Sequence, residues 1–124
     1  MDNLLLLTDS YKVSHWAQYP PGTETVYSYF ESRGGKYDEV CFFGLQYFLK
    51  RYLAGEVVTK ARIDEAAAYY EGHFPPGFEF NRKGWEHIVD EHKGRLPLTI
   101  KAVPEGTVVG VKSVLSDLGV RVKV

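Results

Sequence analysis

The sequence predicts an α+β fold with a mostly antiparallel sheet and a block of about three to four helices. Short apolar or alternating segments lie near both ends of the chain, while helical periodicity fills its middle, so strands and helices are segregated. A chain of 124 residues can bury about two thirds of its surface, which suffices for one compact core and not for two. We therefore expect a single domain over residues 1–124.

The first residues predict a short strand followed by a short helix. Residues 4–7 are four leucines, a run that suits a buried strand. Thr8, Asp9 and Ser10 can each cap a following helix by accepting hydrogen bonds from its free N–H groups. That helix must end before Pro20, because proline cannot continue a helix.

An aromatic strand is expected over residues 25–32. Val26 and Phe30 lie on one face of this strand, and Tyr27 and Tyr29 on the other. We therefore expect both of its faces to be covered. The Arg33-Gly34-Gly35 loop ends the strand.

Three helices are predicted in the middle of the chain. The first covers residues 45–53, whose apolar residues share one helical face, and Gly55 supplies its stop. Thr59 caps the second helix, which the proline-containing residues 74–77 must end. A third, short helix is expected over residues 84–91.

The last part of the chain predicts strands. Residues 98–102 alternate between apolar and polar side chains, as in a strand with one solvated face. Residues 104–106 are typical of a turn, after which residues 107–111 are expected to return as a second strand. The final residues alternate as well and place three valines on one face: Val120, Val122 and Val124.

The composition excludes several classes of function. Fifteen basic residues against sixteen acidic ones give a net charge of −1, so no basic field attracts a nucleic acid. The abundant aromatic residues argue against disorder. A single cysteine favours a reducing, cytoplasmic environment, and no apolar run is long enough for a signal peptide or a membrane span.

Local motifs for phosphate loops, metal sites and activated nucleophiles are missing. Cys41 stands beside two phenylalanines, which favours an inert core cysteine over a nucleophile. The four histidines fall in separate predicted elements without metal-ligand spacing, and we expect them at helix surfaces or ends: His15, His73, His87 and His92. The sequence thus predicts neither a metal site nor a catalytic residue in this chain.

Two polar clusters among apolar residues are candidates for ligand contact. After the leucine run, an open helix N-terminus at Asp9 could hold a ligand and Tyr11 could stack on a flat ring. The alternative is a helix cap with a packed tyrosine. At the end of the aromatic strand, Arg33 beside two glycines could bind a phosphate bidentately, and the alternative is a surface ion pair. The residues alone leave these alternatives open.

Six segments of the chain form a collinear pattern. They are TDSYKVSH at 8–15, QYPPGT at 18–23, VYSYFESR at 26–33, FGLQY at 43–47, VVTK at 57–60 and KAVPEG at 101–106. In this order and with these gaps they resemble the amino-terminal region of the nicotinamide phosphoribosyltransferases. The resemblance extends from residue 4 to residue 109, nearly the whole chain.

The resemblance implies an activity and a homodimer. Enzymes of this family make nicotinamide mononucleotide and pyrophosphate from nicotinamide and phosphoribosyl pyrophosphate, in the salvage route to NAD, and their sites lie at the subunit interface. It further implies that Asp9 accepts from the nicotinamide carboxamide N–H, that Tyr11 stacks on the pyridine ring, and that Arg33 contacts the donor's phosphates. These residue types suit a flat neutral ring and a polyanion.

The chain departs from the family pattern in two respects. Family members are several-fold longer, and the barrel-like domain with the catalytic histidine lies beyond the matched region. Residues 110–124 diverge into an unrelated tail. We therefore expect a truncated, frameshifted or fragmentary product that is inactive alone and binds no cofactor by itself. Mg²⁺ and ATP are implied only for the full-length family.

Two alternatives to this function stay open. One is a free-standing binding or regulatory module derived from this domain, in which the strand at the carboxyl end closes the sheet. The other is the nicotinate-using branch of the superfamily. Asp9 argues against that branch, because its carboxylate would repel the carboxylate of nicotinate.

Overall fold

The computed structural model describes residues 3–121, which form two compact units. The first comprises residues 3–22 with Tyr52–Leu96, and the second comprises Thr23–Arg51 with residues 97–121. Helices make up the first unit and the second contains the strands, so the predicted α+β class is confirmed. Within the described residues the antiparallel strands do not close into a barrel. That residues 1–124 form a single domain stays a prediction.

Four helices make up the first unit. Two 3-10 helices, η1 (Leu4–Leu6) and η2 (Ser10–Gln18), precede the α-helices α2 (Lys60–His73) and α3 (Arg82–His92). The strand predicted over residues 4–7 is therefore wrong. The Asn3 side chain caps η1 by accepting from the Leu5 N–H at 3.1 Å, and a short apolar run carries no periodicity that separates helix from strand.

The core of the first unit lies where η1, α2 and α3 meet. Its fully buried members are Val58, Ile63 and Ala66, and Tyr70 is 3% exposed. The other buried members are Leu5, Val57 and Ile88. Burial of each large side chain contributes about 1.5–3 kcal/mol, so this cluster dominates the stability of the unit.

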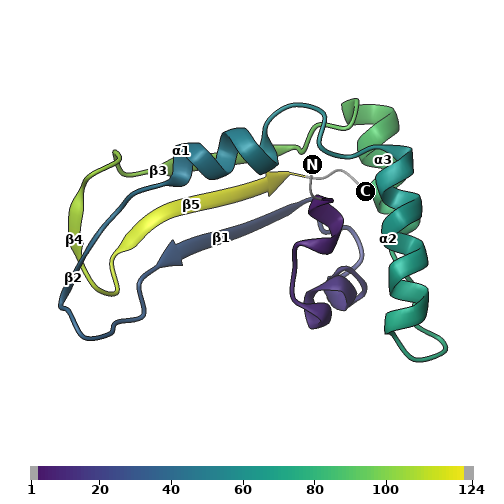
Figure 1. Ribbon diagram of the computed structural model, residues 1–124, viewed down its shortest axis with the longest axis horizontal. Helices are drawn as coiled ribbons and strands as arrows, with labels where there is room; N and C mark the ends of the chain where they lie inside the picture. The colour runs from purple at the N-terminus through teal and green to yellow at the C-terminus, as the bar shows by residue number, and fades with distance from the viewer. Residues whose placement is uncertain (1–2, 122–124) are drawn as a thin grey trace. The chain divides into compact units, whose positions relative to one another are not determined.

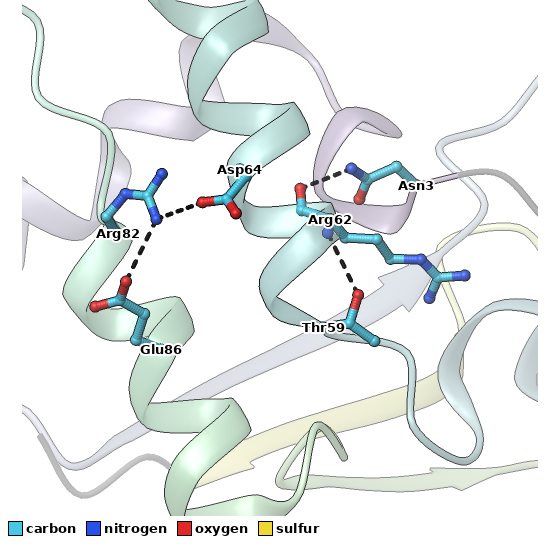
Figure 2. A network of polar contacts seen from close by, with 6 residues as sticks. All are labelled: Asn3, Thr59, Arg62, Asp64, Arg82 and Glu86. Atoms are coloured by element: carbon cyan, nitrogen blue, oxygen red, sulfur yellow. Dashed lines mark hydrogen bonds and ion pairs between the residues drawn. The ribbon is translucent and has the colours of Figure 1, made fainter.

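Polar contacts fix α2 at its start and to α3 (Figure 2). The Thr59 hydroxyl accepts from the Arg62 N–H at 3.3 Å, which confirms the predicted cap. On the other side of the helix, Arg82 of α3 donates to Asp64 of α2 at 2.8 Å and lies 3.4 Å from Glu86. All of these contacts involve the first turns of α2.

The second unit contains two antiparallel sheets. Strand β5 (Val114–Arg121) lies between β1 (Thr25–Glu31) and β3 (Leu98–Ala102), as Figure 1 shows, and Val26 and Leu98 both lie opposite Val120. The smaller sheet pairs β2 (Glu39–Cys41) with β4 (Val108–Gly110). Helix α1 (Leu45–Phe48) follows β2 and continues as the π-helix η3 (Leu49–Leu53).

Strand pairing differs from the expected order in one place. The predicted strand over 107–111 forms as β4, but it pairs with β2 instead of returning beside β3. The partner of β3 is β5, so part of the predicted divergent tail is the central strand of the larger sheet. Val120 lies in this strand, whereas Val122 and Val124 lie outside the described residues.

The expectation that both faces of the aromatic strand are covered is wrong. Tyr27, Tyr29 and Phe30 of β1 are 67%, 60% and 61% exposed. These exposed side chains lie in a unit whose buried hydrophobic residues among 23–51 and 97–116 are Phe42 and Leu115, so no layer of these residues covers both faces of β1. The strand is apolar as its sequence indicates, but the surface that would cover it is not supplied by this unit.

Candidate functional site

Asp9 stands at the N-cap position of η2 but does not cap it. Its backbone is extended, with φ −72° and ψ 139°, and its carboxylate makes no hydrogen bond to the N–H groups of the helix. The carboxylate instead accepts from Lys12 Nζ at 3.0 Å, with both side chains more than half exposed. The predicted side-chain cap is wrong at this residue, because the ammonium group three positions later competes for the carboxylate.

Lys12 keeps the Asp9 carboxylate in its charged form. The hydrogen bond from Lys12 is the largest influence and the attraction between the two charges is next, and together they lower the pKa of Asp9 below its ordinary value. The same contacts raise the pKa of Lys12. An ionised, solvent-facing carboxylate accepts hydrogen bonds and cannot donate one, which suits an amide N–H.

The ring of Tyr11 lies on the surface next to Asp9. Its side chain is 63% exposed, so the alternative of a tyrosine packed into the core does not describe this structure. The ring centroid is 5.5 Å from that of His15, and Lys12 Nζ lies 5.8 Å from it. A largely open aromatic ring beside an anionic acceptor can stack on a flat ligand whose polar edge reaches the carboxylate.

Ser10, between these two residues, is tied to the end of α2. Its Oγ lies 2.7 Å from Nε2 of His73, the last residue of that helix. The His73 ring in turn stacks on Tyr69 with 5.6 Å between centroids and 20° between planes. Sequence patterns gave no sign of this contact, because the two residues are 63 positions apart; Lys12, in contrast, could have been found from its spacing to Asp9.

Arg33 belongs to the second unit and is described separately from Asp9 and Tyr11. It lies two residues after the end of β1, and its side chain is exposed. The next residue, Gly34, has φ +112°, a conformation that favours glycine, and a Cβ there would meet nothing within 4 Å. Lys112 N–H donates to the Ser32 carbonyl at 2.8 Å and fixes the end of the strand before Arg33. A guanidinium at such an open loop can reach a polyanion with both of its donor edges.

The remaining candidates carry no site. Cys41 is exposed, so its predicted place in the core is wrong; side chains alternate along β2 and Phe42 takes the buried position. All four histidines lie in helices as expected, although His87 and His92 share α3 and are not in separate elements. Within residues 3–121, no group of three or more His, Cys, Asp or Glu side chains could hold a metal ion.

Comparison with known proteins gives the family. Residues 3–100 match the model described as nicotinamide phosphoribosyltransferase, N-terminal domain. The chain is 55% identical over 118 residues, 95% of its length, to a nicotinamide phosphoribosyltransferase of Xanthomonas campestris pv. campestris (strain 8004). It is 34% identical, over an alignment of 123 residues, to a nicotinamide phosphoribosyltransferase of Acinetobacter baylyi, and this alignment covers 89% of the chain. The chain spans 24% of the length of each relative. The six collinear segments and these matches agree: the chain belongs to the nicotinamide phosphoribosyltransferase family and contains its amino-terminal domain.

Proposed function

We propose that the chain is the amino-terminal part of an enzyme that transfers the phosphoribosyl group of phosphoribosyl pyrophosphate to nicotinamide. The products are nicotinamide mononucleotide and pyrophosphate, in NAD salvage. The observation that carries this proposal is the 55% identity over 95% of the chain to a relative named for this activity. Because the chain spans 24% of that relative, the activity is proposed for an enzyme that includes this region, and the chain alone is proposed to be inactive.

Nicotinamide is the ligand proposed for Asp9 and Tyr11. The Asp9 carboxylate is charged and more than half exposed, so it can accept from the carboxamide N–H. The Tyr11 ring stands two residues later with most of its surface open to stack on the pyridine ring. In this arrangement the pair orients the base and takes no part in bond making.

Arg33 is proposed to bind the phosphates of the phosphoribosyl donor. The planar donors of its guanidinium match phosphate oxygens bidentately. The glycine after it leaves the loop open for a large polyanion.

A homodimer is part of the proposal, with this region of one subunit completing the site of the other. The exposed aromatic residues of the second unit support it, because large apolar side chains at the surface are common in interaction sites. They are Tyr27, Tyr29, Phe30, Tyr37, Phe43, Tyr47 and Phe48.

Cofactors and location complete the proposal. Among the described residues no group of three or more His, Cys, Asp or Glu side chains could hold a metal ion, and Mg²⁺ and ATP are proposed only for the full-length enzyme. The exposed thiol of Cys41 fits a reducing compartment and supports a cytoplasmic location. No described helix is long and apolar enough to cross a membrane.

Turnover tests the proposal directly. The experiment compares the purified 124-residue chain with a full-length enzyme that carries this chain as its amino-terminal region, each given nicotinamide and phosphoribosyl pyrophosphate. Nicotinamide mononucleotide should form only with the full-length enzyme. Turnover by the isolated chain would contradict the claim that it is inactive alone, and no turnover by the full-length enzyme would contradict the activity.

Substitutions in that enzyme test the site residues. Tyr11→Ala should raise KM for nicotinamide by about tenfold, the usual worth of a base stacked on an aromatic ring, and leave KM for the donor unchanged. Arg33→Ala should raise KM for the donor by about tenfold or more and leave KM for nicotinamide unchanged. Tyr19→Ala at the other end of η2 and Arg95→Ala are the matched controls. A change that affects both substrates equally would count against the assigned contacts.

The nicotinate-using branch is the closest alternative in chemistry. Asp9 would repel the carboxylate of nicotinate, although the Lys12 ammonium at 3.0 Å reduces that repulsion. Asp9→Asn should therefore shift the preference between the two bases toward nicotinate, as read from kcat/KM for each. A wild-type preference for nicotinate would favour this branch instead.

A free-standing binding module is the second candidate, and β5 favours it. This strand comes from the part of the chain expected to diverge, yet it pairs with both β1 and β3 and completes the larger sheet. A monodisperse species with a cooperative melting transition would support a module. Aggregation of the purified chain would point to a fragment with uncovered apolar surface.

A further inference from the structure

The amino-terminal segment follows α2 from its first turn to its last. Figure 1 shows this segment, in purple, beside α2, and Figure 2 shows Asn3 at its start. Asn3 Nδ2 donates to the Arg62 carbonyl at 2.8 Å and to the Glu65 carboxylate at 2.9 Å. Farther along the helix, the Tyr70 hydroxyl donates to the Leu5 carbonyl at 2.7 Å. The amino-terminal segment is therefore hydrogen-bonded to α2 at several points along the helix.

The last contact of this series is the one between His73 and Ser10. The 2.7 Å between Nε2 and Oγ is a hydrogen-bond distance, and both side chains are exposed. His73 lies at the end of α2. Ser10 lies between Asp9 and Tyr11, the two residues proposed to contact nicotinamide. The contact thus fixes the backbone from which both side chains extend.

Helix η2 lies mostly at the surface of its unit. Helix η2 contains no buried residue, and Val13 is only partly buried against the core. Asp9, which could have fixed the helix start by capping it, is engaged with Lys12 instead. The hydrogen bond between Ser10 and His73, called the tether below, can therefore determine how the Asp9 and Tyr11 side chains are oriented.

The imidazole is itself held in place. The Tyr69 ring stacks on it at 5.6 Å, and the Phe74 ring meets it edge-on, with 4.9 Å between centroids and 82° between planes. Rings of this kind restrict the rotation of the His73 side chain, so little conformational entropy is lost when it bonds to Ser10. The end of α2 thus holds His73 in the orientation that its hydrogen bond to Ser10 needs.

We propose that His73 is a positioning residue for nicotinamide binding, acting through Ser10 on Asp9 and Tyr11. This inference rests on the proposed function, since it assigns His73 a role toward the ligand of those two residues. His73 contacts neither the base nor the reacting atoms. Its effect is on the orientation of the two groups that receive the base, and so on KM for nicotinamide and not on the chemical step.

Steady-state kinetics in the full-length enzyme that carries this chain tests the proposal. His73→Ala and Ser10→Ala should each raise KM for nicotinamide by about fivefold, the worth of one hydrogen bond, with kcat and KM for the donor unchanged. The double variant should match either single variant, because both remove the same contact. His73→Gln, whose amide reaches to the place of Nε2, should restore most of the affinity. His87→Ala on α3 is the control.

Amide hydrogen exchange in the 124-residue chain separates this inference from the proposed function. Exchange at residues 10–13 should become faster in His73→Ala and in Ser10→Ala and stay unchanged in His87→Ala. Faster exchange with an unchanged KM would overturn the positioning role, and unchanged exchange would overturn the tether. If Tyr11→Ala leaves KM for nicotinamide unchanged, the assignment of the base fails, whatever His73 does to exchange.

Discussion

At the scale of single residues, the candidate site depends on charges that are paired and yet open to solvent. Asp9 has a lowered pKa because Lys12 donates to it and carries the opposite charge, but both side chains are more than half exposed. Such a pair is weak and screened by salt, so a ligand can compete for the carboxylate without a large penalty. A buried pair would have held Asp9 too firmly to receive an amide.

Lys12→Gln should therefore raise the pKa of Asp9 toward its ordinary value. A lowered pKa in the folded chain means that Asp9 contributes stability above the pKa of the unfolded chain and loses it as pH falls through the folded value. The variant should lose this acid-range dependence. Carboxyl-carbon NMR titration of Asp9 measures the shift, with Lys83→Gln as the control. An equal Asp9 pKa in wild type and Lys12→Gln would disprove the pairing.

Tyr70 is a buried residue whose hydroxyl carries a structural hydrogen bond. Tyr70→Phe leaves the Leu5 carbonyl without its donor and should lower the free energy of unfolding by about 1–2 kcal/mol in urea denaturation. Tyr69→Phe, at an exposed position, should stay within about 0.5 kcal/mol of wild type.

Alkaline pH gives a second measure of the same residue. Burial is the main cause that raises the pKa of Tyr70, with the neighbouring Tyr69 adding to it. Its stabilising effect is present below the unfolded value, about 10, and is lost as pH rises through the folded value. Tyr70→Phe should flatten this loss. If the stability of the variant falls with rising pH as steeply as that of wild type, other tyrosines cause the loss.

At the scale of elements, backbone contacts join α2 and α3 as much as side chains do. Gly94 follows α3, and its carbonyl accepts from the N–H groups of Val57 and Val58 at 3.0 Å each, which ties the end of α3 to the segment before α2. In the second unit, the Glu105 carboxylate plays a similar part by accepting from Gly44 and Gln46 N–H groups at the start of α1. Both links connect elements distant in sequence.

Gly94→Ala should break the first of these links. Gly94 has φ +70°, and an added Cβ would collide with the Val58 carbonyl oxygen, so the chain must move. We expect a loss of about 2 kcal/mol or more in the free energy of unfolding. The matched variant is Gly72→Ala inside α2, where a Cβ meets nothing within 4 Å and should add about 0.5–1 kcal/mol. Similar effects of both variants would contradict the close approach at Gly94.

Elements with a strong period or a defined cap could be predicted from the sequence. Thr59 and the prolines after Phe74 mark α2 correctly, and residues 98–102 alternate as β3 does. The leucine run forms a 3-10 helix because Asn3 caps it and α2 binds it. The cap is local in sequence, but the contact between Asn3 and α2 joins residues 59 positions apart. Strand partners could not be predicted either, since β4 has the same local pattern whether it pairs with β2 or β3.

The site was predictable only in part, for the same reason. Asp9, Tyr11 and Arg33 attracted notice as polar residues among apolar ones, but their proposed roles came from the family pattern. The exposure of Tyr11 and the pairing of Asp9 with Lys12 follow from the local conformation of η2. His73 carried no signal at all, because its connection to the segment of Asp9 and Tyr11 exists only once α2 is folded against it.

At the scale of the whole molecule, the two units differ in how much apolar surface each buries by itself. The first has a continuous cluster of seven buried residues. In the second, the buried hydrophobic residues among 23–51 and 97–116 are Phe42 and Leu115, whereas β1 exposes Tyr27, Tyr29 and Phe30. Hydrophobic burial is the main stabilising contribution to folding, so the second unit depends on a covering surface in a way that the first does not.

Hydrogen exchange at two protein concentrations should reveal this difference. In dilute chain, amides of α2 should exchange slowly and those of β1 and β3, the edge strands of the larger sheet, much faster. At high concentration, self-association through the exposed aromatic residues should slow exchange in β1 while α2 stays unchanged. Tyr29→Ser with Phe30→Ser should abolish that concentration dependence, and Tyr69→Ser, an exposed tyrosine of the first unit, should preserve it. Slow exchange in β1 that is independent of concentration, in a chain shown to be monomeric by sedimentation, would mean that the second unit is stable without any covering surface.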